Sequence, residues 1–153
     1  MSVAALLLAG RTVVGAVGAG STDTLTLTYE VSGLRVIHRI SPANDIVAVR
    51  LYLLGGAQQL TERNQGIEGL LLRASALGTE QFPGGEARRA IDLTGSVVVL
   101  QPDLDWTVFG FTGLVGDVDA AWRVFADRLL HPTLSAEAVA QARARMVSEA
   151  NRR

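Results

Sequence analysis

The stretch GIEGLLLRASALGT, residues 66–79, carries the pattern on which the fold prediction depends. Its apolar residues recur three or four positions apart, which is the spacing of one face of an α-helix. They are Ile67, Leu70, Leu71, Ala74 and Leu77. Gly78 comes next and is suited to end a helix. The sequence therefore predicts a helix over residues 62–77 with one apolar face.

Strand patterns precede this helix. Residues 24–31, TLTLTYEV, alternate apolar and polar side chains, and residues 34–40, LRVIHRI, do so less regularly. The Ser-Gly dipeptide between them is a turn signal, so the two segments predict a β-hairpin. Residues 45–56, DIVAVRLYLLGG, predict a longer and more buried strand that ends in glycines.

A second set of elements follows the helix. Residues 82–95, FPGGEARRAIDLTG, predict a short helix that Gly95 closes. Residues 96–102, SVVVLQP, and 106–115, WTVFGFTGLV, are rich in β-branched and aromatic residues and predict a second hairpin. Two capped helices complete the chain. Asp117 precedes the first apolar stripe, which stops near Pro132 and consists of Val118, Ala121, Trp122, Phe125 and Leu129. Ser135 precedes the second stripe, which consists of Val139, Ala142 and Met146.

The order β-β-β-α-α-β-β-α-α, with antiparallel hairpins, favours an α+β fold over a doubly wound parallel sheet. A length of 153 residues suits a single domain, and 48% hydrophobic residues allow a packed core. The net charge is −1, and the basic residues are spread along the chain, so nucleic acid is not an expected partner. The absence of cysteine excludes disulfides and thiolate chemistry.

The N-terminal segment suggests a compartment outside the cytoplasm. Residues 2–20, SVAALLLAGRTVVGAVGAG, are apolar or small except for Arg11 and Thr12. We expect residues 1–21 to be a signal peptide or a membrane anchor, with membrane contact through residues 2–20. The alternative is an ordinary buried segment. Arg11 and the lack of a basic start count against a simple signal peptide.

Four segments together resemble the N-terminal domain of the pitrilysin and insulinase family of zinc peptidases, to which the processing peptidases belong. They are SGLRVIHRISP, VAVRLYLLGGAQQLTERNQGIEGLLLRASALGTEQFPGGE, WTVFGFTGLVGDVDAAWRVFADRLLHPTLS and RARMVSEANRR. The resemblance covers residues 26–153 and implies antiparallel hairpins packed against helices. Because family domains usually continue with more helices and a closing strand, we expect residues 24–153 to form a partial domain.

The resemblance also implies that catalysis is lost. Active members carry the motif H-x-x-E-H on one helix, where the two histidines bind Zn²⁺ and the glutamate activates the metal-bound water. In this chain Gly69 stands at the first histidine, Leu72 at the glutamate and Arg73 at the second histidine. An arginine keeps its proton and repels a metal cation. We therefore expect no peptidase activity, no metal site and no cofactor.

One ligand position of the family is retained. Glu149 follows Arg73 by 76 residues, which is close to the family spacing for the third ligand. It is either a relic of that ligand or a solvent-facing helix residue. If the fold is kept, Arg73 and Glu149 should approach within about 6 Å and form an ion pair in place of the metal. His38 and His131 lie far from each other in sequence, and for both we expect structural or surface roles.

The resemblance further implies that residues 96–102 form the strand along which the family binds extended peptides. The apolar run Val97–Leu100 has two interpretations. It is either buried on both faces or an adhesive edge suited to a permanent partner, and we favour burial by a partner.

Two functions follow from the resemblance. The first is a non-catalytic subunit of an extracytoplasmic, membrane-associated protein complex, with hetero-oligomeric protein partners. The second is the non-catalytic chain of a two-chain zinc peptidase, where it helps to bind peptide. An unrelated binding module with accidental similarity is a third, weaker alternative.

Overall fold

The structure, a computed structural model, describes residues 25–152 and divides into two compact units, Met1–Asn44 and Asp45–Arg153. The segment 1–21, expected to be a signal peptide or anchor, lies outside the described residues. Within residues 25–152 we find no helix with both the length and the apolar character needed to cross a membrane.

The first unit contains the predicted hairpin. Strands β1 (Thr26–Val31) and β2 (Leu34–Arg39) pair antiparallel, with Val31 opposite Leu34. Ser32 and Gly33 form the two-residue turn with φ angles of 50° and 84°. Two consecutive positive φ angles are what a tight hairpin turn requires, and they explain the glycine. The hairpin prediction is confirmed.

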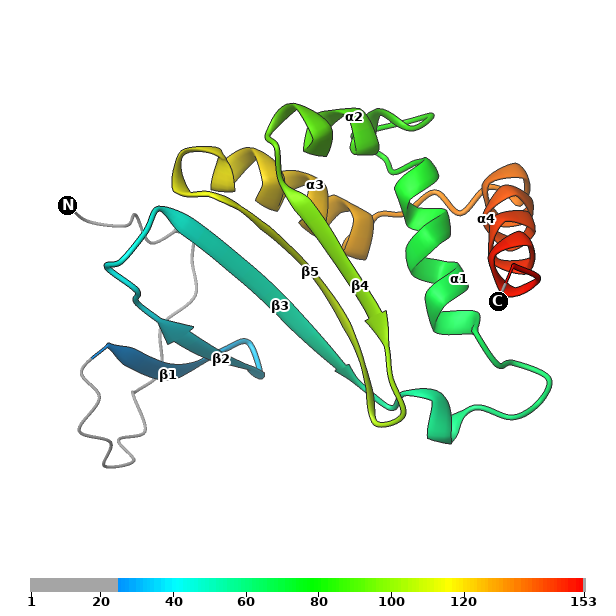
Figure 1. The fold of residues 1–153 in the computed structure, drawn as a ribbon, viewed down its shortest axis with the longest axis horizontal. Helices are drawn as coiled ribbons and strands as arrows, with labels where there is room; N and C mark the ends of the chain where they lie inside the picture. The colour runs from blue at the N-terminus through cyan, green and yellow to red at the C-terminus, as the bar shows by residue number, and fades with distance from the viewer. Residues whose placement is uncertain (1–24, 153) are drawn as a thin grey trace. The chain divides into compact units, whose positions relative to one another are not determined.

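The second unit is built on a three-stranded antiparallel sheet (Figure 1). Strands β3 (Ile46–Leu54), β4 (Val97–Pro102) and β5 (Trp106–Leu114) stand in the order β3-β5-β4. β4 and β5 form the predicted hairpin. β3 is longer than β1 and β2, as predicted, but the expectation that it is more buried holds only for every second residue. The residues between them are exposed, and the strand lies at one edge of this sheet. A long apolar run does not distinguish a central strand from an edge strand.

The second unit also contains a short 3₁₀ turn after β3, Ala57–Gln59, another after β5, Val115–Asp117, and four helices. They are α1 (Ile67–Ala74), α2 (Glu86–Leu93), α3 (Val118–Leu130) and α4 (Ala136–Ala150). α1 continues as a 3₁₀ turn over Ser75–Leu77 and ends at Gly78, as predicted. It begins five residues later than the predicted residue 62 because Gly66 takes a left-handed conformation, with φ of 79°.

The two predicted caps differ. The Ser135 side chain accepts a hydrogen bond from the Ala138 amide at 3.1 Å and so caps α4. Asp117 stands at the N-cap position of α3 but makes no capping hydrogen bond through its side chain. It contributes a negative charge near the helix start, where the helix dipole favours one.

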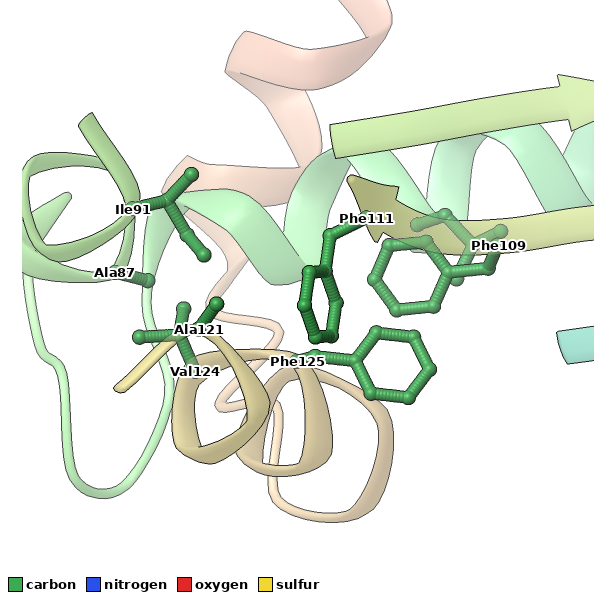
Figure 2. Packing of buried hydrophobic residues seen from close by; sticks show 8 residues of the cluster. Ala87, Ile91, Phe109, Phe111, Ala121, Val124 and Phe125 are labelled. Carbon is green, nitrogen blue, oxygen red and sulfur yellow. The ribbon is translucent and has the colours of Figure 1, made fainter. Parts of the chain in front are cut away.

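The core lies between the sheet and helices α2 and α3. Phe109 and Phe111 from β5 face Phe125 from α3, with ring centroids 4.9 Å and 5.8 Å away (Figure 2). Ala121 and Val124 of α3 lie beside Ala87 and Ile91 of α2 in the same cluster, as Figure 2 shows. The predicted α3 stripe thus faces the core. The α+β fold of antiparallel hairpins packed against helices is confirmed.

Candidate functional site

Helix α1 holds the three positions expected to be catalytic relics. It lies beside β4, and α4 packs against it (Figure 1). Gly69 and Leu72 are buried, and Leu72 belongs to the hydrophobic core with 3% exposure. The side chain of Arg73 is 35% exposed. Because positions 69 and 73 are one turn apart, they lie on the same face of the helix.

Gly69 leaves the space that the Arg73 side chain occupies. A Cβ at position 69 would lie 3.1 Å from Nη1 of Arg73, a tight contact. It would also lie 3.7 Å from Cε of Met146 on α4, so the two helices approach closely at this glycine. The guanidinium therefore covers the face of α1 at position 69, which the resemblance noted in the sequence aligns with the first histidine of active members.

Arg73 also reaches α4. Its Nη2 lies 3.4 Å from Oε2 of Glu149, so the ion pair predicted from the sequence is present. The Glu149 side chain is 59% exposed. A solvent-exposed pair of this kind contributes at most about 1 kcal/mol to stability. In this pair the Arg73 side chain extends from α1 towards α4.

The side chains at these positions do not fit a zinc ion. Arginine has five N–H donors and no lone pair to offer a metal, glycine has no side chain, and leucine has no ligand atom. Among residues 25–152, no group of three His, Asp or Glu side chains is placed to hold a metal. Glu149 alone retains ligand chemistry, and it is paired with Arg73.

The two histidines lie in other elements of the chain. His38 lies in β2 of the first unit and is half-buried. His131 ends α3, where its Nδ1 lies 3.1 Å from Oδ1 of Asp127. This pairing agrees with the structural role expected for His131.

Asp127 fixes the loop that follows α1. It is buried, and its Oδ2 accepts a hydrogen bond from the Gln81 amide at 3.0 Å. Burial alone would raise the pKa of Asp127, but hydrogen bonds from the Thr79 side chain, the Gln81 amide and His131 lower the pKa below its usual value. The Gly-Thr segment at the end of α1 is thereby attached to α3.

We expect Asp127→Asn to lower the free energy of unfolding by about 1–3 kcal/mol near pH 6, the usual effect of disrupting a buried, charge-assisted hydrogen-bond network. Because the folded-state pKa is depressed, this stabilisation is present above the unfolded pKa of 3.8 and disappears as pH falls through the folded value. Chemical denaturation from pH 6 to pH 2.5 measures the difference. The exposed Asp92→Asn is the control, with an effect within about 0.5 kcal/mol. A difference that grew on acidification would contradict this account.

A pocket of about 460 Å³ lies next to the Arg73–Glu149 pair. α1, α2, α3, α4 and β4 all contribute to its wall. Leu72, Ile91 and Leu100 supply apolar surface. The charged residues of the wall are Arg73, Arg88, Asp92, Arg128, Arg145 and Glu149. A larger but more open depression along α4, from Ala140 to Arg152, includes none of the α1 positions.

Strand β4 borders this pocket and forms the second edge of the sheet. Within the described residues it pairs with β5 alone. Val97 is 64% exposed, whereas Val98, Val99 and Leu100 are half-buried. The interpretation that the Val97–Leu100 run is buried on both faces is therefore wrong, and the edge interpretation agrees with the structure.

The sequence interpretation missed Arg128. It lies on α3 two turns after Ala121 and one turn after Phe125, which is the spacing of the apolar stripe. Arg128 is only 7% exposed. A charged residue at a core-facing position was the available signal. Burial lowers the pKa of Arg128 to about 10, which leaves it protonated at neutral pH.

Comparison with known proteins gives one family. The family described as Insulinase (Peptidase family M16) matches residues 35–152. No curated protein matches the chain.

Solved structures share the fold, and two of them serve as examples. A protease from Helicobacter pylori is 17% identical, with a TM-score of 0.73 over 81% of this chain and 30% of that one. The first half of the periplasmic protease PqqL from Escherichia coli is 18% identical, with a TM-score of 0.75 over 88% of this chain and 31% of that one. The chain therefore spans less than a third of either protein structure.

Proposed function

Because the chain belongs to the insulinase family of peptidases (family M16), we propose that it is a non-catalytic homologue that serves as an accessory subunit of a protein complex. The position of Arg73 carries the proposal. Its guanidinium lies over Gly69 and pairs with Glu149, so a positive charge occupies the region that the resemblance aligns with the metal site of active members.

The second missing function is the general base. Leu72 stands at the position of the catalytic glutamate and packs in the core. An aliphatic side chain neither accepts a proton nor orients a water molecule. Restoring one ligand alone would therefore not restore hydrolysis, since both the metal and the base are replaced.

What supports partner binding is the edge position of β4, which within residues 25–152 pairs with β5 alone. An edge strand offers unpaired backbone N–H and C=O groups, and an extended segment of another protein can pair with them. The exposed Val97 and the pocket beside Val98 and Leu100 add side-chain contacts. The same features favour the second candidate, in which the chain helps an active partner chain to hold peptide.

An extracytoplasmic location is part of the proposal. The apolar segment 2–20 has the composition of a signal peptide or membrane anchor. A structurally similar protein, PqqL, is described as periplasmic.

The test is purification of the natural protein from envelope and soluble fractions, followed by mass spectrometry of the proteins that accompany it. We expect a reproducible protein partner, no stoichiometric zinc in this chain and no peptide cleavage by it alone. A partner that carries an intact H-x-x-E-H motif would select the two-chain peptidase. Stoichiometric zinc together with peptide cleavage by the chain alone would contradict both candidates.

A further inference from the structure

The pocket beside β4 has an excess of positive charge. Four arginines face two carboxylates in its wall. Arg73 pairs with Glu149 at 3.4 Å, and Arg88 pairs with Asp92 at 3.7 Å. Among the described residues, Arg128 and Arg145 are left without a carboxylate partner. The pocket therefore has two guanidinium groups available for an anion.

Arg128 is the unusual member of this set. It is 7% exposed, and its one hydrogen bond runs from Nη2 to the Leu72 carbonyl at 2.9 Å. Its Nε has no hydrogen-bond partner among the described residues. The guanidinium also lies 4.9 Å from the centre of the Phe109 ring, which holds its plane in place. A buried cation without a counter-charge is costly, so its presence at the pocket wall points to an anionic ligand.

The position of β4 beside the pocket indicates what kind of molecule would supply this negative charge. In the register of the sheet, Val98 stands opposite Phe111 and Leu100 opposite Phe109, so these two β4 side chains lie on the core side. Both line the pocket. A strand that paired with the free edge of β4 would direct every second side chain to the same side. Consecutive side chains on that side are about 7 Å apart, so one of them can enter the pocket while the next contacts its rim.

We infer that the pocket recognises the carboxylate of an aspartate or glutamate in an extended partner segment paired with β4, with Arg128 and Arg145 as the binding groups. This inference rests on the proposed function, because it names the chemistry of the segment that the accessory subunit binds. Arg128 is the pre-positioned donor, and Arg145 is the exposed group that closes over the bound carboxylate. The apolar part of the wall, formed by Leu72, Ile91 and Leu100, lowers the local polarity and so strengthens charge-assisted hydrogen bonds.

The experiment uses two fluorescent nine-residue peptides of alternating threonine and valine, one with glutamate and one with glutamine at the centre. Fluorescence anisotropy with the full chain measures their affinities. We expect the glutamate peptide to bind about tenfold more tightly, as for one charge-assisted hydrogen-bonded contact. Arg128→Met and Arg145→Gln should each remove most of this preference and leave binding of the glutamine peptide unchanged.

Arg128→Met keeps most of the side-chain volume and removes the charge and the N–H donors, a replacement that buried sites often tolerate. The Leu72 carbonyl keeps a partner in this variant, since the Ser75 hydroxyl also donates to it at 2.9 Å. If Arg128→Met fails to fold by circular dichroism, the exposed Arg145→Gln decides the result.

Equal binding of the two peptides, or an unchanged preference in both variants, would overturn the inference and leave partner binding at β4 intact. Failure of both peptides to bind, while a natural partner still co-purifies, would also overturn it without affecting the proposed function. Free glutarate can be added as a competitor of the labelled glutamate peptide. If it displaced that peptide as effectively as the unlabelled glutamate peptide does, the pocket would be a small-molecule site and the strand pairing would be refuted.

Discussion

Replacing Phe109 by alanine is expected to lower the free energy of unfolding by about 3–5 kcal/mol, the range for truncation of an aromatic residue in a close-packed core. Phe109 is 0% exposed and lies in the central strand of the three-stranded sheet. Its ring contacts Phe125 at 4.9 Å between centroids, and the Arg128 guanidinium lies over it at the same distance. The substitution would therefore disturb both the core and the arginine that faces the pocket.

Chemical denaturation followed by circular dichroism measures this loss. Leu93→Ala is the matched control, since Leu93 is also a large apolar residue but is 88% exposed, and its effect should stay within about 0.5 kcal/mol. A loss below about 1 kcal/mol for Phe109→Ala would mean that β5 does not form the centre of the core.

Local patterns were enough to predict most of the elements. The Ser-Gly turn, the glycine after α1 and the serine before α4 each act through their own backbone or nearest neighbours. Such effects depend on a few adjacent residues and can be recognised in one sequence. The register of Val98 and Leu100 with β5 follows from the hairpin itself.

Burial was less predictable because it depends on what covers an element. β3 and β4 contain apolar runs of the kind that central strands usually have. Both strands nevertheless lie at the edges of the sheet. Strand order arises from long-range pairing, which periodicity does not encode. Arg128 shows the same limit: it was not among the residues of the predicted α3 stripe, yet the fold buries it.

The pairing of Arg73 with Glu149 could be predicted for a different reason. The resemblance to a family supplied the alignment of two helices that are 76 residues apart, and opposite charges at the two positions supplied the interaction. Composition and spacing alone would not have joined them. The reason for a glycine at position 69 could be recognised only in the structure, where the Arg73 side chain occupies the adjacent space.

This geometry leads to a second large effect. Replacing both Gly69 and Arg73 by histidine is expected to create a zinc site together with Glu149. Two histidines one helical turn apart can bind one metal, and a third protein ligand with a water molecule completes the tetrahedral set that zinc prefers. Glu149 is suitably placed because its Oε2 already lies 3.4 Å from the Arg73 side chain.

The double substitution is needed because each residue constrains the other. With Arg73 removed, the remaining contacts of a Cβ at position 69 are 3.6 Å to Cγ of Pro102 and 3.7 Å to Cε of Met146, which are ordinary van der Waals distances. Gly69→His alone should bind zinc poorly, since the Arg73 cation stays beside the new ligand. Leu72 is left in place, so the core is unchanged and no general base is introduced.

Calorimetric titration with zinc and the melting temperature in its presence provide the measurement. At a free zinc concentration about 100-fold above Kd, the metal should stabilise the double variant by about 2.7 kcal/mol, with no comparable effect on the natural sequence. Adding Glu149→Gln should weaken the site strongly, because an amide oxygen carries no charge to offset the cation. Equal zinc affinity with and without Glu149→Gln would show that position 149 is not a ligand position, and that the Arg73–Glu149 pair is a surface contact with no relation to a former metal site.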